Sequence, residues 1–530
     1  MFKCRMPETA LPRYVLEKSV NNLRSFRSDE SGALAYPTIA FFLAMLAVGG
    51  VGVDLMRLER DRTVLQYTLD RAVLAAADLD QTQEPAVVVQ DYLNKAGLGE
   101  YYEAPEVETG LGYKKVKATI DATFDAHLLQ FAGGSDLPVY ASSTAEESID
   151  GLEISLVLDV SGSMNSNSRL SNLKVAARDF IDTMVENTTD GRMSISIVPY
   201  ATQVSVSDEL FDEYTTSGTN NFANCINFET SDYSTTALST TSERERTMHF
   251  SPWYTSNTRA SGSPIDYEIC DDRSSREILP LQKDATTLKS FITNLTAWGN
   301  TSIDIGMKWG VALLDPSARP AISSLASGAS VPSEFSVRPV DYSDPDTLKI
   351  IVLMTDGQNT SQYYVEDDHR AGDSNVWYDF SANRYSTYNP DNGYYWRDGY
   401  SYWYSSPYGG NNAQQLSYPD LFAYTSLKYL YKYIYADWMG SYSARSEWYY
   451  GVYDYHGNST KNTRTSNVCS AAKAQGIIVY TIGFEAPSNG VAVLQDCASS
   501  DSHYFDVDGL EIRDAFESIA TSIRKLRLTQ

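Results

Sequence analysis

The sequence predicts an α/β protein with a doubly wound, mostly parallel sheet and two large insertions. A single transmembrane helix, a helical stem and a small β-rich segment come before the sheet. Two nearly continuous apolar runs stand at 152–159 and 348–355, a pattern typical of central strands that are covered on both faces. The first run ends in an aspartate, and an aspartate directly follows the second. Strand and helix periodicities alternate over much of 151–526. An uncharged apolar run, Ala33–Val53, precedes this region.

The run Ala33–Val53 is long enough to cross a bilayer. As a helix with a rise of about 1.5 Å per residue it reaches about 31 Å, which matches the apolar thickness of a membrane. A buried core helix is the alternative. The polar leader, residues 1–32, is longer than the segment that normally precedes the apolar part of a cleaved secretory signal. Nearby Lys and Arg counts are tied across the span and do not orient it, whereas the cysteine distribution and the large downstream part favour a cytoplasmic leader.

Residues 54–150 are expected to form the stem and the small β-rich segment. Apolar residues continue at three- and four-residue spacing after the span, which predicts that the membrane helix extends outward as an amphipathic rod. They are Leu55, Leu58, Val64, Leu65, Leu69, Ala72, Val73 and Ala76. Residues 113–124 alternate as a strand does, with Val116, Ala118, Ile120 and Ala122 on one side, and 137–149 reads as the partner strand.

A family resemblance covers roughly residues 20–150. The leader ends in Asp29, Glu30, Ser31, Gly32 and Ala33, and the sequence LQYTLDRAVLAAA follows the span. This order resembles the amino-terminal region of TadG-like proteins of bacterial tight-adherence (Flp) pilus assembly, whose helix is similar to a pilin stem. The resemblance implies a single-pass protein of the bacterial inner membrane, with most of the chain periplasmic or exposed at the cell surface. One position departs from the family's pattern. Pilin-type processing sites usually carry Glu five residues after the cleaved Gly, but five residues after Gly32 stands Pro37.

The net charge limits the classes of partner that the chain can bind, and the cysteines indicate the cellular compartment. A formal net charge of −26 argues against nucleic acid, because phosphate recognition needs a concentrated basic surface. Cys4 precedes the span, and four cysteines follow it, which fits two disulfides in an oxidising compartment. Among the three possible connectivities the sequence-local pairs are favoured, with four free thiols as the alternative. These pairs are Cys225 with Cys270 and Cys469 with Cys497.

The strongest chemical signal follows the apolar run 152–159. Asp159, Ser161 and Ser163 offer one carboxylate and two hydroxyls at alternate positions beyond a buried strand. Such oxygen ligands suit Mg²⁺, Ca²⁺ or Mn²⁺ and disfavour soft metals. In open parallel sheets, ligands bind beyond the carboxyl ends of the strands, where this loop is expected. Because Asp, Ser and Gly are also ordinary turn residues, the loop alone could be a simple connection.

Two later segments strengthen the metal hypothesis. Thr301 lies in a loop that leads into a helix, and Asp356 follows the second buried strand. The order DxSxS, Thr, Asp, in these contexts, resembles the metal-ion-dependent adhesion site of von Willebrand factor A domains over roughly residues 150–526. The resemblance implies that a von Willebrand A-like domain occupies 151–526 and that five residues are the metal ligands. They are Asp159, Ser161, Ser163, Thr301 and Asp356.

The remaining segments of this region support the sheet. Helices are expected at 169–186, 466–475, 490–498 and 509–526, and strands at 192–200, 476–484 and, at the edge, 502–508.

Two insertions are expected within this domain, at 203–284 and 358–465. The second holds more than half of the chain's 38 tyrosines, and its segment 420–439 has helical spacing that predicts packing on the core. Tyr and Trp are enriched at recognition surfaces, although these aromatics could equally build a small core for the insertion. The densest stretch supplies the partner-binding candidates Trp396, Tyr402, Trp403 and Tyr404, for which a glycan partner is possible as well as a protein.

These features favour a membrane-anchored, divalent-cation-dependent protein-binding module acting in pilus assembly or surface adhesion. An acidic side chain of a protein partner, or of another pilus-assembly subunit, would complete the metal's coordination. The alternative is a structural, minor-pilin-like scaffold in which the metal only stabilises the fold. A metal-dependent hydrolase is third, because no phosphate loop or HExxH motif is found and none of the five histidines adjoins a nucleophile motif.

Overall fold

The computed structural model describes residues 34–527, apart from 79–80, 111–112, 125, 130–136, 149–150, 189, 219, 267, 272 and 345. The leader 1–32 and Cys4 therefore lie outside the described residues. The chain divides into two compact units. One takes the residues up to Thr109 together with Lys114–Glu147, and the other takes Gly110–Tyr113 together with the chain from Ser148 onward.

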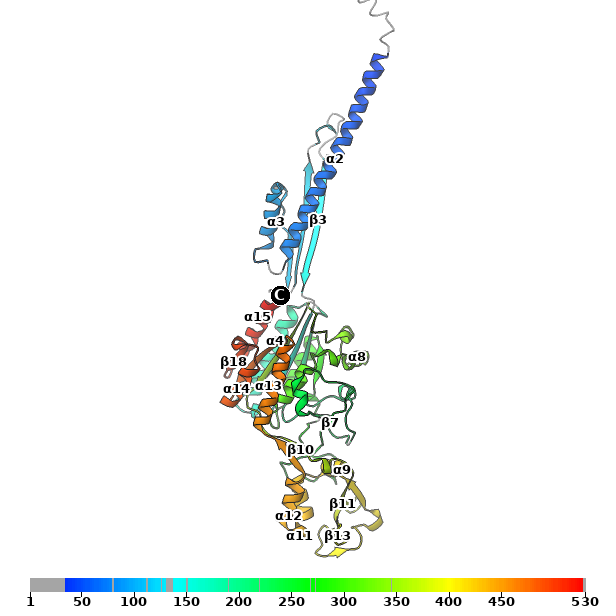
Figure 1. Ribbon diagram of the computed structural model, residues 1–530, viewed down its shortest axis with the longest axis vertical. Helices are drawn as coiled ribbons and strands as arrows, with labels where there is room; N and C mark the ends of the chain where they lie inside the picture. Colours follow the sequence, from blue (N-terminus) through cyan, green and yellow to red (C-terminus); the bar gives the residue numbers. More distant parts are fainter. Residues whose placement is uncertain are drawn as a thin grey trace, which may run out of the picture. The chain divides into compact units, whose positions relative to one another are not determined.

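The first unit is built on one long helix, α2 (Ala35–Ala77) (Figure 1). Its first half presents large apolar side chains to the surroundings, including Ile39, Phe41, Phe42, Leu43 and Leu46. In the described part of the chain it is the one helix long and apolar enough to cross a membrane. Because so many adjacent apolar side chains are rarely left in water, this exposure fits a single-pass membrane anchor.

The second half of α2 packs on a three-stranded sheet, which contains the two expected strands and one further strand. The sheet order is β1 (Glu106–Gly110), β2 (Tyr113–Phe124), β3 (Leu137–Ser148). All four residues expected on one side of β2 are buried in the core that contains Leu65, Leu69 and Val73 of α2. The short helix α3 (Pro85–Lys95), which was not predicted, adds Val88, Val89 and Leu93 to this core.

Two residues of the predicted apolar stripe are exposed instead, Leu55 and Val64. Leu55 lies about one turn before Leu58, nearer the exposed apolar half of the helix. Val64 lies about 100° around the helix from the buried Leu65, so it points away from the sheet.

The second unit is centred on a six-stranded sheet with the order β18-β17-β9-β4-β5-β8. Neighbouring strands from β18 to β5 are parallel, and β8 is antiparallel to β5. The expected mixed α/β architecture is therefore present. The strands are β18 (Tyr504–Val507), β17 (Ile478–Phe484), β9 (Thr347–Thr355), β4 (Gly151–Asp159), β5 (Met193–Tyr200) and β8 (Leu279–Gln282).

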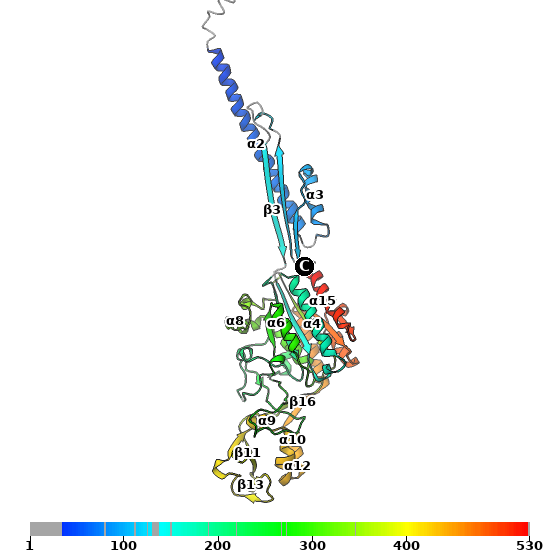
Figure 2. The ribbon, with the colours of Figure 1, turned by 180° about the vertical axis from the view of Figure 1, so that it is seen from behind.

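Every residue of β4 and β5 is buried, since helices cover both faces of the sheet. The strand expected at 192–200 is present as β5, with both of its sides buried. One face packs against α4 (Arg169–Glu186), α6 (Ala285–Asn294) and α15 (Ile512–Arg527), all three of which are labelled in Figure 2. The other face packs against α7 (Ile303–Ala312), α8 (Arg319–Ser327), α13 (Asn458–Ala474) and α14 (Ser488–Cys497).

The first expected insertion, 203–284, contains little regular structure before its last strand joins the main sheet as β8. Its other elements are the helix α5 (Asp208–Phe211) and the short paired strands β6 (Ile226–Asn227) and β7 (Glu245–Arg246).

The second expected insertion, 358–465, leaves the main sheet through an antiparallel pair, β10 (Gln362–Val365) and β16 (Tyr453–His456). Figure 1 shows this pair leading to a small separate sheet. The order of that sheet is β14 (Trp403–Tyr404), β13 (Tyr394–Arg397), β12 (Arg384–Asn389), β11 (Asp373–Asp379), β15 (Gln414–Ser417).

The predicted helix at 420–439 is broken into short pieces. They are α9 (Tyr418–Tyr424), α10 (Leu427–Tyr429), a π-helical turn (Leu430–Tyr435) and α11 (Ala436–Met439), followed by α12 (Ser441–Arg445) and a second π-helical turn (Ser446–Tyr450). Their apolar residues do not join the main core. They form a separate core with the small sheet and with Met248, Phe250 and Ile269 of the first insertion, so the two insertions pack together.

Candidate functional site

The candidate site begins at the carboxyl end of β4, where the parallel register places Asp159 beside the end of β9. Asp159 is fully buried. One of its oxygens accepts the backbone N–H of Ser161 at 2.7 Å, and the other accepts the hydroxyl of Thr355 at 2.6 Å. Burial raises the pKa of the Asp159 carboxyl to about 7, and the negative charge of Asp356 adds to this increase. Burial and the neighbouring charge therefore disfavour the ionised form of Asp159, and a nearby cation would favour it.

The loop hydroxyls connect Asp159 to the second aspartate. The hydroxyl oxygens of Ser161 and Ser163 are 3.0 Å apart, and Ser163 donates its hydroxyl to Oδ1 of Asp356 at 2.7 Å. Burial also raises the pKa of Asp356, although Ser163 and Arg169 oppose the increase. Four of the five predicted ligands thus form one continuous group of contacts at the end of two adjacent strands.

Thr301 lies next to this group and is held mainly through its backbone. Its N–H donates to the hydroxyl of Thr360 at 2.9 Å, and its carbonyl accepts from Nζ of Lys461 at 2.9 Å. A Cβ built on Gly357, the residue after Asp356, would lie 3.6 Å from the hydroxyl oxygen of Thr301. The hydroxyl therefore faces the Asp356 loop, but no hydrogen bond recorded among the described residues joins it to the other four.

Arg169 is a member of the site that the sequence analysis did not identify. Its guanidinium lies 2.8 Å from Oδ2 of Asp356 and 2.8 Å from Glu485, at the end of β17. Asn167 also donates to Glu485, at 3.1 Å. Arg169 is the first residue of α4, directly after the serine loop, so a basic residue at the start of the predicted helix was the available signal.

The donor set fits a hard divalent cation. Two carboxylates and three hydroxyls are the oxygen ligands that Mg²⁺, Ca²⁺ and Mn²⁺ use, and a cation between the two aspartates would relieve their repulsion. Among the described residues, no group of three or more His, Cys, Asp or Glu side chains is arranged to hold a metal. Arg169 already supplies one positive charge, on the Asp356 oxygen that does not contact Ser163.

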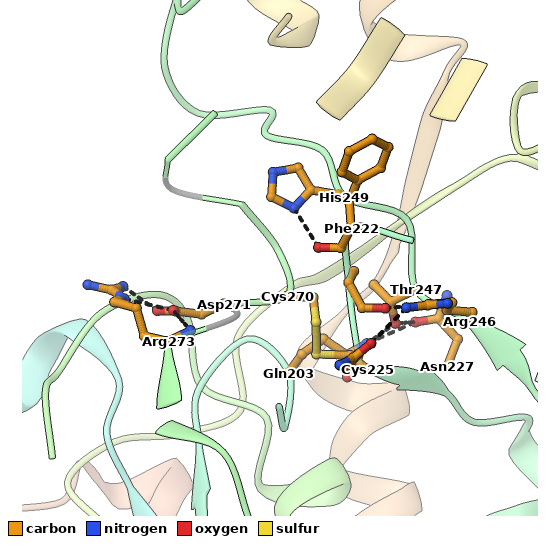
Figure 3. Close-up of a disulfide and its surroundings, with 12 residues drawn as sticks. Gln203, Phe222, Cys225, Asn227, Arg246, Thr247, His249, Cys270, Asp271 and Arg273 are labelled. Carbon is orange, nitrogen blue, oxygen red and sulfur yellow. Dashed lines mark hydrogen bonds and ion pairs between the residues drawn. A yellow bond between two sulfur atoms is a disulfide. The ribbon is translucent and has the colours of Figure 1, made fainter. Parts of the chain in front are cut away.

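Both sequence-local disulfides are formed. Cys469 of α13 is joined to Cys497 of α14, and Cys225 is joined to Cys270 within the first insertion. Figure 3 shows the second bond beside a set of polar side chains, in which Asn227 accepts hydrogen bonds from Gln203 and Thr247, both at 2.8 Å. This bond and its neighbours connect the start of the first insertion, at Gln203, with its later residues.

Of the four partner-binding candidates, three are partly buried by neighbouring side chains and one is exposed. Trp403 packs edge-on against both Trp396 and Trp438, so the two candidate tryptophans are only half-exposed. Tyr402 is exposed, and the guanidinium of Arg397 covers the ring of Tyr404. Other aromatics of the insertion are buried in its core, including Tyr378, Tyr385, Tyr435 and Trp448. The tyrosine-rich segment therefore builds its own core and also displays aromatic side chains.

Comparison with known proteins gives one family match. Residues 32–79 match the Tad family, described as "Putative Flp pilus-assembly TadE/G-like". The resemblance expected over roughly residues 20–150 is therefore confirmed for this segment. No curated protein matches the chain.

Several solved structures resemble the chain at low sequence identity. The pilus adhesin SpaC from Lactobacillus rhamnosus GG, in its open conformation, is 12% identical with a TM-score of 0.30, over 80% of this chain and 33% of that one. The vWF domain of the type V pili tip protein Mfa5 from Porphyromonas gingivalis is 14% identical with a TM-score of 0.31, over 71% and 95%. The PilB minor pilin from Streptococcus sanguinis is 14% identical with a TM-score of 0.29, over 80% and 77%. The chain thus spans about a third of the length of SpaC.

Proposed function

We propose that this chain is a membrane-anchored component of a Flp-type pilus system that binds a protein partner through a divalent cation. The observation that carries the proposal is the group formed by Asp159, Ser161, Ser163 and Asp356 at the carboxyl edge of the six-stranded sheet. Thr301 is the proposed fifth ligand. This arrangement supports assigning the region 151–526 to a von Willebrand A-like domain whose ligand is held beyond the strand ends.

The chain's own residues prepare the site for a cation. The buried strands β4 and β9 fix the two aspartates, and the serine hydroxyls stand between them. When bound, Mg²⁺ would supply a hard Lewis-acidic centre that accepts one more oxygen ligand. An acidic side chain of a protein partner, or of another pilus subunit, is the group best suited to that position because it brings negative charge to the cation.

The remaining parts of the chain support the place of action. The TadE/G-like segment and the exposed apolar half of α2 favour one membrane crossing in the bacterial inner membrane. The two disulfides favour an oxidising compartment for the second unit, which makes it periplasmic or surface-exposed, with residues 1–32 cytoplasmic.

A pulldown with the full chain in detergent tests the proposal. Envelope proteins are captured in Mg²⁺ and in chelator, with the wild type and with Asp159→Asn. We expect at least one pilus-system protein to be retained only by the wild type and only in Mg²⁺. Asp391→Asn, which changes an exposed aspartate of the small sheet, is the control and should behave as the wild type. The same partners retained in chelator would refute cation-dependent binding.

A structural role is the second candidate, and the Arg169 contact favours it. Because Arg169 already neutralises part of the charge of Asp356, the site is partly satisfied without a partner. In that case Mg²⁺ would raise the melting temperature of the chain while partner retention in the pulldown stayed the same in Mg²⁺ and in chelator.

A further inference from the structure

A pocket of about 380 Å³ lies directly beside the serine loop of the candidate metal site. It is lined by Gly162, Trp253, Tyr254, Trp298, Gly299 and Asn300. Gly162 stands between the two loop serines, so one wall of the pocket is the backbone of the metal loop itself. The opposite walls are aromatic, and they come from the first insertion and from the loop that carries Thr301.

The aromatic walls are held in place by hydrogen bonds to the metal loop. The backbone N–H of Trp298 donates to the carbonyl of Val160, and the N–H of Gly162 donates to the carbonyl of Gly299, both at 2.9 Å. The buried guanidinium of Arg276 donates to the carbonyls of both Val160 and Trp298. Two of these four hydrogen bonds are made by Trp298 itself, and three of the four involve backbone groups of the metal loop, so the loop that carries Trp298 is fixed against it.

The two walls from the first insertion are fixed as well. The ring of Trp253 meets the rings of Trp298 and Tyr363 edge-on, with centroids 6.5 and 6.1 Å apart. Nζ of Lys428 donates to the carbonyl of Trp253, and the hydroxyl of Tyr449 donates to the carbonyl of Pro252. The pocket is thus formed before any ligand binds, which lowers the entropic cost of binding.

We propose that this aromatic pocket receives a bulky apolar side chain of a protein partner, next to the acidic side chain that reaches the metal. The proposal rests on the proposed function and adds a second determinant to it. Three aromatic rings offer a large apolar contact area for an aromatic or proline side chain, and the adjacent cation site selects for a neighbouring carboxylate. The preferred partner segment therefore carries an acidic residue followed by a large apolar residue.

The lining favours such a side chain over a sugar. Sugar recognition needs several polar groups to pair with hydroxyls as well as a ring to stack on. Besides the Tyr254 hydroxyl and the two indole N–H groups, the lining has one polar side chain, Asn300, and its amide nitrogen already donates to the carbonyl of Ser361 at 2.8 Å. The other non-aromatic residues are glycines. An acidic sugar is therefore the competing ligand that the test has to exclude.

Fluorine NMR with defined peptides tests the proposal on the full chain in detergent. Three hexapeptides carry an Asp–4-fluoro-Phe, an Asn–4-fluoro-Phe or an Asp–Gly pair between glycines. The Asp–Gly peptide has no fluorine, so its binding is measured by competition with the Asp–4-fluoro-Phe peptide. In Mg²⁺ we expect the Asp–4-fluoro-Phe peptide to bind at least tenfold more tightly than Asp–Gly. Tyr254→Ala should abolish this difference. Tyr394→Ala is the matched control, because Tyr394 is 47% exposed and Tyr254 is 48% exposed.

The outcomes separate the pocket from the metal. Equal binding of the Asp–4-fluoro-Phe and Asp–Gly peptides would overturn the pocket assignment while leaving the metal intact. A second outcome is ring-dependent binding that is lost in Tyr254→Ala. If this binding is the same in chelator and for the Asn–4-fluoro-Phe peptide, it supports the pocket and rejects cation-dependent binding. Displacement by galacturonate with no effect of the ring would favour a sugar and overturn the proposal. Unchanged thermal melting of Tyr254→Ala confirms that the variant is folded, and Trp253→Ala replaces it if it is not.

Discussion

At the scale of single residues, the main feature of the candidate site is a pair of buried acidic side chains, Asp159 and Asp356. Asp159 is fully buried and accepts two hydrogen bonds, yet burial and the nearby Asp356 still raise its pKa to about 7. Keeping two neighbouring acidic groups buried, with Arg169 paired to Asp356 but not to Asp159, costs stability. Buried acidic groups that destabilise the metal-free protein are suited to a divalent cation, because the bound cation would balance their charge.

Asp159→Asn should therefore stabilise the chain when no metal is present. The amide keeps the shape of the side chain and removes a buried charge, so in chelator we expect about 1 kcal/mol of added stability, or a few degrees in melting temperature. In Mg²⁺ the wild type should regain the advantage. Thermal unfolding in chelator, followed by circular dichroism, measures this effect. A clear loss of stability in chelator would show that Asp159 serves the fold rather than a ligand.

Arg169→Gln should have the opposite effect, because it removes the cation already present. Asp356 loses its ion pair, and breaking a largely buried pair costs about 3 kcal/mol. The stabilisation by Mg²⁺ should become larger in this variant, since the metal then supplies the missing charge. Melting curves of both proteins across a Mg²⁺ titration test this point. An equal metal-induced shift in the two proteins would mean that Arg169 and the cation act independently.

At the scale of elements, periodicity predicted most of the core, and non-local contacts account for the failures. The helix 169–186 and the apolar strands at 152–159 and 348–355 match the structure closely, since their patterns arise from burial within each element. The segment 420–439 has helical spacing, but its Tyr and Trp side chains pack into an irregular core shared with the first insertion. Spacing within one segment does not contain that information.

The same contrast holds within the site. The closeness of Asp159 and Asp356 could be predicted because each stands at the carboxyl end of a buried strand, and parallel strands bring these ends together. Arg169 could not be assigned, since its role depends on how the first turn of α4 faces the end of β9. Trp253 and Trp298 come together only because the first insertion folds back against the Thr301 loop.

The packed half of α2 gives a prediction with an internal control. Leu69→Asn places an amide in the fully buried core of the first unit and should cost about 3 kcal/mol. Leu74→Asn changes a side chain that is 64% exposed on the same helix and should change stability by less than about 0.5 kcal/mol. Limited proteolysis of the first unit in the full chain compares the two. Equal sensitivity would contradict the packing of α2 on the three-stranded sheet.

The disulfide between α13 and α14 gives a second prediction at this scale. It closes a loop of 28 residues, so replacing both cysteines by Ala should cost about 3 kcal/mol of stability. Because α13 also carries Lys461, which donates to the carbonyl of Thr301, the loss should weaken Mg²⁺ binding only modestly. Unfolding in urea measures the first effect. Full stability of the double variant would argue against an oxidised second unit.

At the scale of the whole molecule, the chain combines an exposed apolar helix that fits a membrane anchor, a disulfide-bonded α/β unit and a pair of insertions that pack together. The insertions supply Trp253 and Tyr254 to the edge of the candidate site, and they display further aromatic side chains from the small sheet. Partner binding is thus expected to use the cation for charge and the aromatic pocket for shape. Pilus components that present an acidic residue beside a large apolar one are the expected ligands.

Calorimetric titration of Mg²⁺ into the metal-free full chain in detergent tests the central claim most directly. We predict one binding site in the wild type and in Asp391→Asn, and no detectable site in Asp159→Asn. Mn²⁺ should occupy the same site in competition with Mg²⁺. Binding that is unchanged in Asp159→Asn, or no binding in the wild type, would contradict the assignment of these residues as a cation site.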